Sequence, residues 1–275
     1  WGLWNGINNI SPPTRLSFLP YLSGGFRVSP TSKGDVTEFL RSGGMDVKYG
    51  INESFTLDMT LIPDFAQVQS DNVLLNLSPF EVKFDDYRPF FTEGTELFNK
   101  AGLFYSRRVG AEPGLAGAVL SKYGNMPADY DIKKNPGITR LYNATKFSGR
   151  TKGNLGIGIF NAVTAPMYAK IREISAAKDT SILTEPLTNY NIIVFDQALK
   201  NRSSVSFTNT NVLRKGNSRN ANVSSLDLSL FDKKNNYNFS FSGRYSSIWG
   251  KQENKNGFTT GATFGKVSGK LQYKA

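Results

Sequence analysis

The chain has 275 residues, 39% of them hydrophobic and 13% aromatic, and its formal net charge at pH 7 is +11. This length suits one large β domain or two small ones, and no apolar run reaches the roughly 18 residues of a transmembrane helix, which excludes that element. Histidine and cysteine are both absent, which excludes Ser-His-Asp catalysis, Cys-His catalysis and disulfide bonds within this chain.

The positive charge is concentrated in predicted turns and loops. No basic helix and no nucleic-acid-binding motif accompanies it, so we expect no nucleic-acid partner. Contact with anionic lipid head groups or with lipopolysaccharide phosphates fits this distribution better, and simple solvation of the loops is the alternative. The basic residues concerned are Arg150, Lys152, Arg202, Arg214, Lys215, Arg219, Lys233, Lys234, Lys251 and Lys255.

The N-terminal part of the chain contains three predicted strands. A hairpin is predicted from 45–51 and 54–62 around a tight turn at Asn52 and Glu53, and the up-and-down order of the strands then requires an earlier strand near 15–28. In a membrane barrel this turn would be periplasmic, which also places the N-terminus in the periplasm.

The segment 63–140 is far too long for an ordinary connection between strands. It is rich in proline and aromatic residues, and it is neither low in complexity nor acidic enough for disorder. Both of its ends are predicted at the extracellular rim. We therefore expect it to fold inward as a lumen plug or to cap the mouth, since irregular backbone at membrane depth must be surrounded by protein or a water-filled lumen.

The second half of the chain has connections that alternate between short and long. Short turns are predicted at 149–153, 200–203 and 232–236, and longer loops at 165–187, 213–220 and 247–256. Bacterial outer-membrane barrels show this alternation, with tight periplasmic turns and longer external loops. A soluble sandwich has no reason to sort its loops in this way.

The predicted strands alternate apolar and polar residues. Leu226, Leu228 and Leu230 share one face, and Asp227 and Ser229 lie on the other. The apolar face meets lipid in a barrel and a core in a sandwich, so this alternation fits both folds. The loop pattern decides between them. We predict an all-β fold, an antiparallel up-and-down transmembrane β-barrel that is incomplete in this chain, with an internal plug or cap segment.

Three regions follow from this interpretation. Residues 1–62 hold N-terminal barrel strands, 63–140 form the inserted plug or extracellular cap, and 141–275 form barrel strands with alternating connections. We count roughly ten or eleven strands, whereas single-chain bacterial barrels have even numbers. We therefore expect the chain to be an excerpt of a longer protein, and an exported barrel would also need a signal sequence.

Several motifs occur in a fixed order. An RPFF-x-EG block lies at 88–94, an SRR-x-G block at 106–110 and a GRT-x-G block at 149–153. The series resembles an uncharacterised domain family of Gram-negative outer-membrane proteins, over about Gly44 to Lys270. In that family the domain usually follows a carbohydrate-binding-like β-sandwich of the family 9 type. The matching residues are Asn76, Phe80, Glu81, Pro89, Phe90, Phe91, Gly94, Gly149, Arg150 and Gly153. The resemblance implies a large membrane barrel with no settled activity.

The most concentrated polar residues are Arg88, Glu93, Glu96, Arg107 and Arg108. As a functional site they would line a charged constriction, because rings of charge set selectivity in pores. As a structural network they would pin the plug to the barrel wall through ion pairs, a task that suits the bidentate arginine fork.

Catalytic and metal sites are weakly indicated. Asp85 and Asp86, together with Glu81 and Glu93, are candidates for a glycosidase pair, but their spacing defines no cleft between two carboxylates. No cofactor is predicted. We predict no metal site either, because the acidic residues near Asp131 lack the pattern of a calcium loop.

The sequence predicts an integral protein of the cell outer membrane, acting in porin-like solute passage or as a barrel subunit of an envelope assembly, without catalysis. Its expected partners are outer-membrane lipid, lipopolysaccharide and other envelope proteins. One alternative is a surface glycan-handling protein or hydrolase built on a barrel. A second is a soluble β-sandwich adhesion module, which would carry polar residues on both sheet exteriors.

Overall fold

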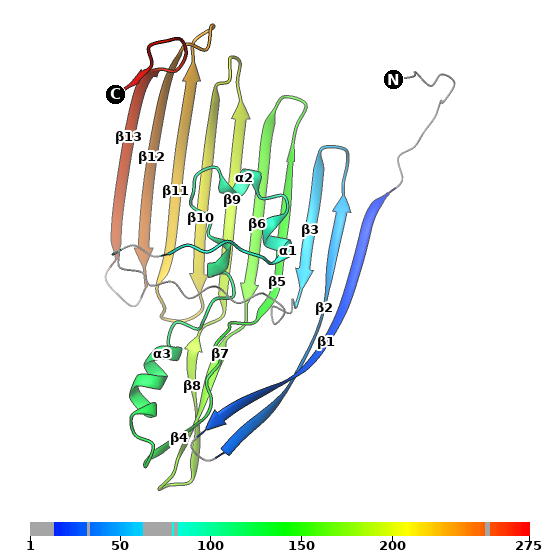
Figure 1. The fold of residues 1–275 in the computed structure, drawn as a ribbon, viewed down its shortest axis with the longest axis vertical. Coiled ribbons are helices and arrows are strands. Elements are labelled where there is room, and N and C mark those ends of the chain that lie inside the picture. The colour runs from blue at the N-terminus through cyan, green and yellow to red at the C-terminus, as the bar shows by residue number, and fades with distance from the viewer. Residues whose placement is uncertain (1–13, 32–33, 63–78, 80–81, 251–253) are drawn as a thin grey trace.

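The computed structural model describes residues 14–31, 34–62, 79, 82–250 and 254–275. These residues form an 11-stranded sheet in the order β1-β2-β3-β5-β6-β9-β10-β11-β12-β13-β14, and a three-stranded sheet in the order β4-β7-β8 (Figure 1). Every strand pair of the large sheet is antiparallel. The predicted all-β, antiparallel fold is therefore confirmed.

The three N-terminal strands occur in the regions where the sequence predicts strands. They are β1 (Arg15–Thr31), β2 (Gly34–Gly50) and β3 (Phe55–Leu61). The β2–β3 turn is held by Asn52, whose Oδ1 accepts hydrogen bonds from the backbone N–H groups of Ser54 at 2.8 Å and Phe55 at 2.9 Å. Asparagine favours such turns because its short side chain reaches the backbone just beyond it.

The second half supplies the remaining long strands of the large sheet. They are β5 (Leu141–Arg150), β6 (Leu155–Thr164), β9 (Thr188–Ala198), β10 (Ser204–Arg214), β11 (Asn220–Phe231), β12 (Tyr237–Trp249) and β13 (Lys255–Lys266), and the short β14 (Tyr273–Lys274) ends the sheet. The tight turns between them use left-handed residues, with positive φ at Asn154, Asn201, Arg202 and Asn235. Asparagine tolerates this conformation better than most residues.

The connection 165–187, predicted as a loop, forms a hairpin instead. Its strands are β7 (Met167–Glu173) and β8 (Lys178–Glu185). A third strand, β4 (Tyr130–Lys134), pairs with β7. Ala169 and Ile171 are buried against Val119, which lies in the short helix α3 (Ala116–Val119), ahead of the helical turn η2 (Leu120–Gly124). The loop prediction was wrong because it overlooked the period-two burial that this contact requires.

The large sheet has two faces, which the register extends from strand to strand. We call the face that carries Lys146, Phe160 and Ile192 the inner face, and the face that carries Phe147 and Ile159 the outer face. Figure 1 shows α1 (Pro89–Thr92) and α2 (Glu96–Asn99) lying over the strands around β5, β6 and β9. Across the described residues, no helix is long and apolar enough to span a bilayer.

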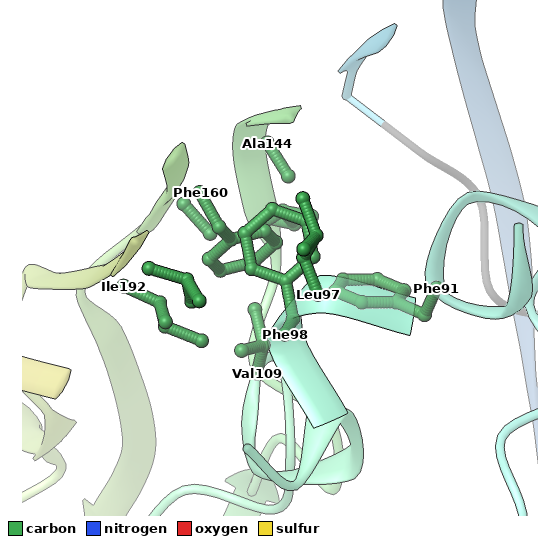
Figure 2. Close-up of a cluster of buried hydrophobic side chains, with 10 residues drawn as sticks. Phe91, Leu97, Phe98, Val109, Ala144, Phe160 and Ile192 are labelled. Atoms are coloured by element: carbon green, nitrogen blue, oxygen red, sulfur yellow. The ribbon is translucent and has the colours of Figure 1, made fainter. Parts of the chain in front are cut away.

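We call the described part of residues 82–140, which carries α1 and α2, the covering segment. The main hydrophobic core lies between the covering segment and the inner face (Figure 2). Phe98 of α2 is fully buried and meets Phe160 of β6 edge to face, with 6.2 Å between ring centroids. Phe91 of α1 lies 6.1 Å from the same ring. Because two rings of this segment pack against a ring of β6, the segment is an integral part of the fold.

The large sheet is open among the described residues. Its order begins at β1 and ends at β14, and these two strands do not pair with each other. The closed barrel that the sequence predicted is therefore not found in the described part of the chain.

Candidate functional site

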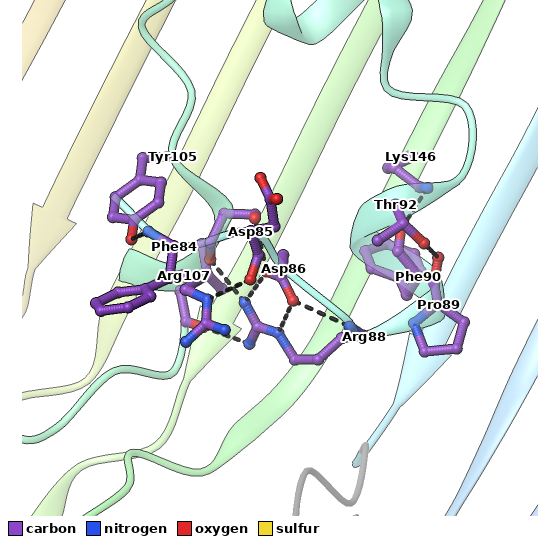
Figure 3. A network of polar contacts seen from close by, with 12 residues as sticks. Phe84, Asp85, Asp86, Arg88, Pro89, Phe90, Thr92, Tyr105, Arg107 and Lys146 are labelled. Atoms are coloured by element: carbon purple, nitrogen blue, oxygen red, sulfur yellow. Dashed lines mark hydrogen bonds and ion pairs between the residues drawn. The ribbon is translucent and has the colours of Figure 1, made fainter. Parts of the chain in front are cut away.

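The polar residues of the covering segment gather first around Arg88 (Figure 3). Its guanidinium pairs with Asp86, with 2.6 Å between Nη2 and Oδ2 and 2.8 Å between Nε and Oδ1. It also donates to the backbone carbonyls of Val109 and Ser106, both at 2.8 Å. The Ser106 hydroxyl donates to Asp86 Oδ2 at 2.6 Å. These bonds join the start of α1 to η1 (Ser106–Arg108).

Asp86 is held as a carboxylate by this network. Burial raises its pKa, but the hydrogen bonds from Arg88 and Ser106 outweigh burial, and the pKa falls below its ordinary value. Only 7% of the Asp86 side chain and 9% of the Arg88 side chain are exposed. Hydrogen bonds between this buried pair and Ser106 and Val109 join two parts of the segment, and the pair presents little charge to a solute.

The two neighbouring arginines lie close to this network. Arg107 Nε donates to the backbone carbonyl of Asp85 at 2.8 Å, and its guanidinium lies 5.8 Å from the ring of Phe84. The guanidinium of Arg108 lies 5.9 Å from the ring of Tyr105. Two of the five predicted polar residues, Arg88 and Arg107, thus contact Asp86 and Asp85, whereas Arg108 lies against Tyr105.

Glu93 lies apart from that group and faces the first strands of the sheet. Its carboxylate pairs with Lys48 of β2 at 2.8 Å, and both side chains are more than half exposed. The hydrogen bond from Lys48 lowers the pKa of Glu93. The backbone carbonyl of Glu93 accepts a hydrogen bond from the buried Lys146 at 2.5 Å, and that of Phe90 accepts a second one.

These contacts give the RPFF-x-EG block a physical explanation. Pro89 occupies the first turn of α1, where a missing N–H costs nothing. Phe90 covers the Lys146 ammonium, which lies 4.5 Å from the ring centroid, while Phe91 enters the core. Gly94 has a φ of 59°, a conformation that favours glycine.

A third polar group joins α2 to β5 and β9. Asp196 has only 2% of its side chain exposed, and its Oδ2 accepts from Arg150 Nη2 at 2.6 Å and Lys100 Nζ at 2.7 Å. Glu96 reaches the same arginine at 3.4 Å. Gly156, opposite Asp196, leaves room for Leu97, since a Cβ there would lie 2.7 Å from that side chain. We call Asp196, Arg150 and Lys100 the Asp196 cluster.

An open cavity of about 400 Å³ lies beside the Asp196 cluster, over the inner face of β10–β13. Serine and threonine supply half of its twelve lining residues. The lining residues from these strands include Ser204, Ser206, Asp227, Ser229, Ser240, Ser242, Gly261 and Thr263.

The five predicted polar residues therefore do not form a single cluster. Glu93 and Glu96 each reach a cation of the sheet, away from the arginines. In the GRT-x-G block, Gly149 lies against the backbone of Ser54, where a Cβ would be 2.1 Å from the carbonyl oxygen. Gly153 lies in the β5–β6 turn. Asn76, Phe80 and Glu81 lie outside the described residues.

Sequence reasoning missed Lys100, Lys146 and Asp196, which carry the closest polar contacts to the sheet. The signal was available for Asp196, because this charge lies at an inner-face position of β9 between Val194 and Ala198, which are both apolar. Within the described ranges, no group of three histidine, cysteine or acidic side chains is placed to hold a metal ion.

Comparison with known proteins gives one match. Neither a curated protein nor a solved structure matches the chain. Residues 12–275 match the model of a family described as a domain of unknown function, DUF5916. This description assigns no activity, and it links the family neither to a membrane barrel nor to a carbohydrate-binding module. Since the match spans nearly the whole sequence, the chain belongs to the DUF5916 family.

Proposed function

We propose that this chain forms part of the wall of an outer-membrane β-barrel, with the segment 82–140 inside or at the mouth of the lumen. The protein would act in the passage of a solute and would not be a catalyst. Its principal partner would be outer-membrane lipid, including lipopolysaccharide at the external rim. The observation that carries this proposal is the apolar outer face of the large sheet.

The outer face exposes large apolar side chains on strands from β1 to β13. Soluble monomers rarely expose a continuous apolar patch of more than a few hundred Å², whereas the lipid-facing side of a barrel is apolar throughout. Phe258 is 84% exposed and Leu226 is 46% exposed. The exposed outer-face residues include Leu16, Phe18, Ile159, Ile193, Phe195, Phe207, Leu226, Leu230, Phe239, Tyr245, Phe258 and Phe264.

The lengths of the strands fit the thickness of a membrane. β10 has 11 residues and β12 has 13, and a tilted strand needs about 9–11 residues to cross the hydrocarbon layer. A sandwich would bury this face against a second sheet. The three-stranded sheet β4-β7-β8 instead packs against α3 and η2.

A row of asparagines supports one boundary of the apolar belt. Asn161, Asn191, Asn211 and Asn222 are register partners across β6, β9, β10 and β11 on the outer face. Asn161 donates to Asn191 at 2.7 Å. Amide groups are costly to place in hydrocarbon, so this row suits the head-group level. It lies toward the longer connections, which are external in bacterial barrels.

The inner face supports the placement of the segment 82–140. Irregular backbone at membrane depth requires protein or a water-filled lumen around it. The described part of this segment, beginning at residue 82, contains short helices, turns and the five-residue strand β4. Its core contacts with Phe160 and Ile192 are on the inner face. On this basis the outer face is left for lipid.

The first test is fractionation of the full-length protein, combined with heat-modifiable mobility on a detergent gel. The expected result is recovery in the outer membrane with a band shift that depends on folding. Recovery as a soluble protein without such a shift would contradict the proposal.

A matched pair of variants makes the test specific to the outer face. Leu226→Arg places a charge in the middle of the apolar belt, and Ser242→Arg places one on the inner face of the neighbouring strand. An arginine at the bilayer midplane costs about 2–4 kcal/mol on the lipid face of a barrel. We therefore expect Leu226→Arg to reduce outer-membrane recovery and the folded band, and Ser242→Arg to leave both near the parent level. A face in water would tolerate Leu226→Arg.

A further inference from the structure

The inner face of β10–β13 is lined by small hydroxyl side chains. Register partners continue the pattern from strand to strand, as in Ser206, Asp227 and Ser242, or Ser204, Ser229 and Ser240. Thr263 of β13 pairs with Ser240 and extends the second row. Hydroxyl groups both donate and accept hydrogen bonds, so this wall can exchange bonds with any neutral polar solute.

The charged groups at the cavity are already paired. Both cations of the Asp196 cluster, Lys100 and Arg150, bind the same carboxylate, at 2.7 and 2.6 Å. Arg244 donates to the backbone carbonyl of Ala101 at 3.0 Å. Asp227 accepts the hydroxyl of Ser225 at 2.6 Å.

Selection of ions in pores depends on a ring of charge of one sign. The cavity lining contains one cation, Lys100, and two carboxylates, Asp196 and Asp227, so charges of both signs are present and no ring of one sign is formed. Such a wall favours neither anions nor cations, and a neutral polar solute can exchange its hydrogen bonds to water for hydrogen bonds to the wall.

The lining also lacks the feature that would hold a sugar tightly. Phe241 borders the cavity, but its register partners Leu228 and Ala262 place it on the outer face. The remaining lining residues contribute no aromatic ring. Conduction requires binding that is weak enough for the solute to leave, which this hydroxyl wall supplies.

We infer that the cavity over β10–β13 is a path for neutral, polyhydroxylated solutes such as sugars and polyols. The solute exchanges hydrogen bonds with successive serine and threonine hydroxyls. The Asp196 cluster and the contact between Arg244 and Ala101 fix the edge of the covering segment that borders the path. This inference rests on the proposed function, because it requires the cavity to lie inside a membrane barrel.

The test uses the full-length protein reconstituted into phospholipid vesicles. Three sugar-derived probes of similar size carry different charges: glucose is neutral, gluconate is an anion and glucosamine is a cation. The rate of entry of each probe is normalised to the amount of protein in the heat-modifiable, folded band. Glucose is expected to enter several-fold faster than either charged analogue.

Two substitutions on one strand provide the matched control. Thr263→Phe narrows the path, since Thr263 lines the cavity. Thr260→Phe places the same ring on the outer face, where Thr260 is exposed and pairs with Gly243. Entry of glucose is expected to fall several-fold in Thr263→Phe and to stay unchanged in Thr260→Phe. Ser240→Phe, opposite Thr263, repeats the test if Thr263→Phe does not insert.

The outcomes distinguish a failure of the neutral-solute path from a failure of the proposed membrane barrel. A folded, inserted protein that admits gluconate or glucosamine as fast as glucose overturns the neutral path and leaves the barrel intact. So does an inserted Thr263→Phe or Ser240→Phe variant that admits glucose at the parent rate. A protein that does not insert and shows no heat-modifiable band overturns the proposed function and the path together.

Discussion

The inner face of the large sheet has two halves that differ in composition. Where α1 and α2 cover it, on β5, β6 and β9, it carries Ala144, Phe160, Ile192 and Val194. Toward β12 and β13, where no described helix lies over it, the inner-face residues at the cavity are Ser240, Ser242, Gly261 and Thr263. The outer face exposes large apolar side chains in both halves, apart from the asparagine row toward the longer connections. The composition of the inner face thus depends on what covers each strand. The exposed apolar residues of the outer face, in contrast, are what contact with a single apolar medium would favour.

This difference bears on how the covering segment is held. Its contact with the covered half is an aromatic core around Phe98 and Phe160, and burial of apolar area is the dominant favourable contribution to folding. Its contacts at the border of the open half are polar, through Lys100 and Ala101. We therefore expect the core to supply most of the stability of the segment, with the polar contacts fixing its orientation.

Loss of the core contact should have the largest effect. Phe98→Ala removes a fully buried ring and should lower the free energy of unfolding by about 3–5 kcal/mol. Ser242→Ala, on the open half, should change it by no more than about 0.5 kcal/mol. Urea unfolding of the purified protein, together with proteolysis of residues 82–140, measures both. Similar effects of the two variants would contradict the division into halves.

The border between the halves should be the next most sensitive place. Asp196→Asn keeps the shape of the side chain but removes the charge shared by Lys100 and Arg150. Hydrogen bonds to charged groups contribute about 1.5–3 kcal/mol each, and both cations are about one-third exposed, so we expect a loss near the lower limit. Asp227→Asn is the control, because Asp227 accepts a hydrogen bond from the Ser225 hydroxyl and forms no ion pair with another described residue. Equal urea midpoints for the two variants would remove the Asp196 cluster from the account.

The buried pair of Arg88 and Asp86 should make stability depend on pH. The folded-state pKa of Asp86 lies below its ordinary value of 3.8. Its contribution is therefore complete above the ordinary pKa and is lost as the pH falls through the lower, folded-state pKa. Asp86→Asn should be less stable than the parent at neutral pH, and the difference should shrink at acidic pH. Urea unfolding across this range tests it, and a constant difference would contradict it.

The exposed pair of Lys48 and Glu93 should have the smallest effect. Both side chains are more than half exposed, and exposed ion pairs are typically worth about 0.2–1 kcal/mol. Glu93→Gln should lie at the low end of that range, with any effect reduced by added salt. A loss as large as that of Asp196→Asn in the same urea assay would show that this contact is a principal anchor.

The sequence was informative about the strands and much less so about the covering segment. Turn residues and apolar–polar alternation are local signals, so the hairpin at Asn52 and the turns at 149–153 and 232–236 were readable without the structure, and the strand near 15–28 followed from the up-and-down order of the strands. The hairpin β7–β8 was missed because its buried residues, Ala169 and Ile171, are few and small. Local strand signals also do not show whether the sheet closes into a barrel, because closure depends on whether its two edge strands pair.

The candidate site was harder to predict because its partners are distant in sequence. Lys100 and Asp196 are 96 residues apart, and no local pattern joins them. Glu93 and Glu96 were grouped with the arginines because they are neighbours in the chain. The structure separates them because short helices with four residues each turn successive side chains toward different strands.

The most direct test of the central claim is a nitroxide scan along β13. The chain has no cysteine, so single cysteines at positions 258–263 can each be spin-labelled in the full-length protein in lipid vesicles. Accessibility to oxygen reports lipid, and accessibility to a water-soluble nickel complex reports water. We expect accessibility to alternate with a period of two residues, with oxygen accessibility higher at 258, 260 and 262 and nickel accessibility higher at 259, 261 and 263. Equal nickel accessibility at all six positions would contradict it.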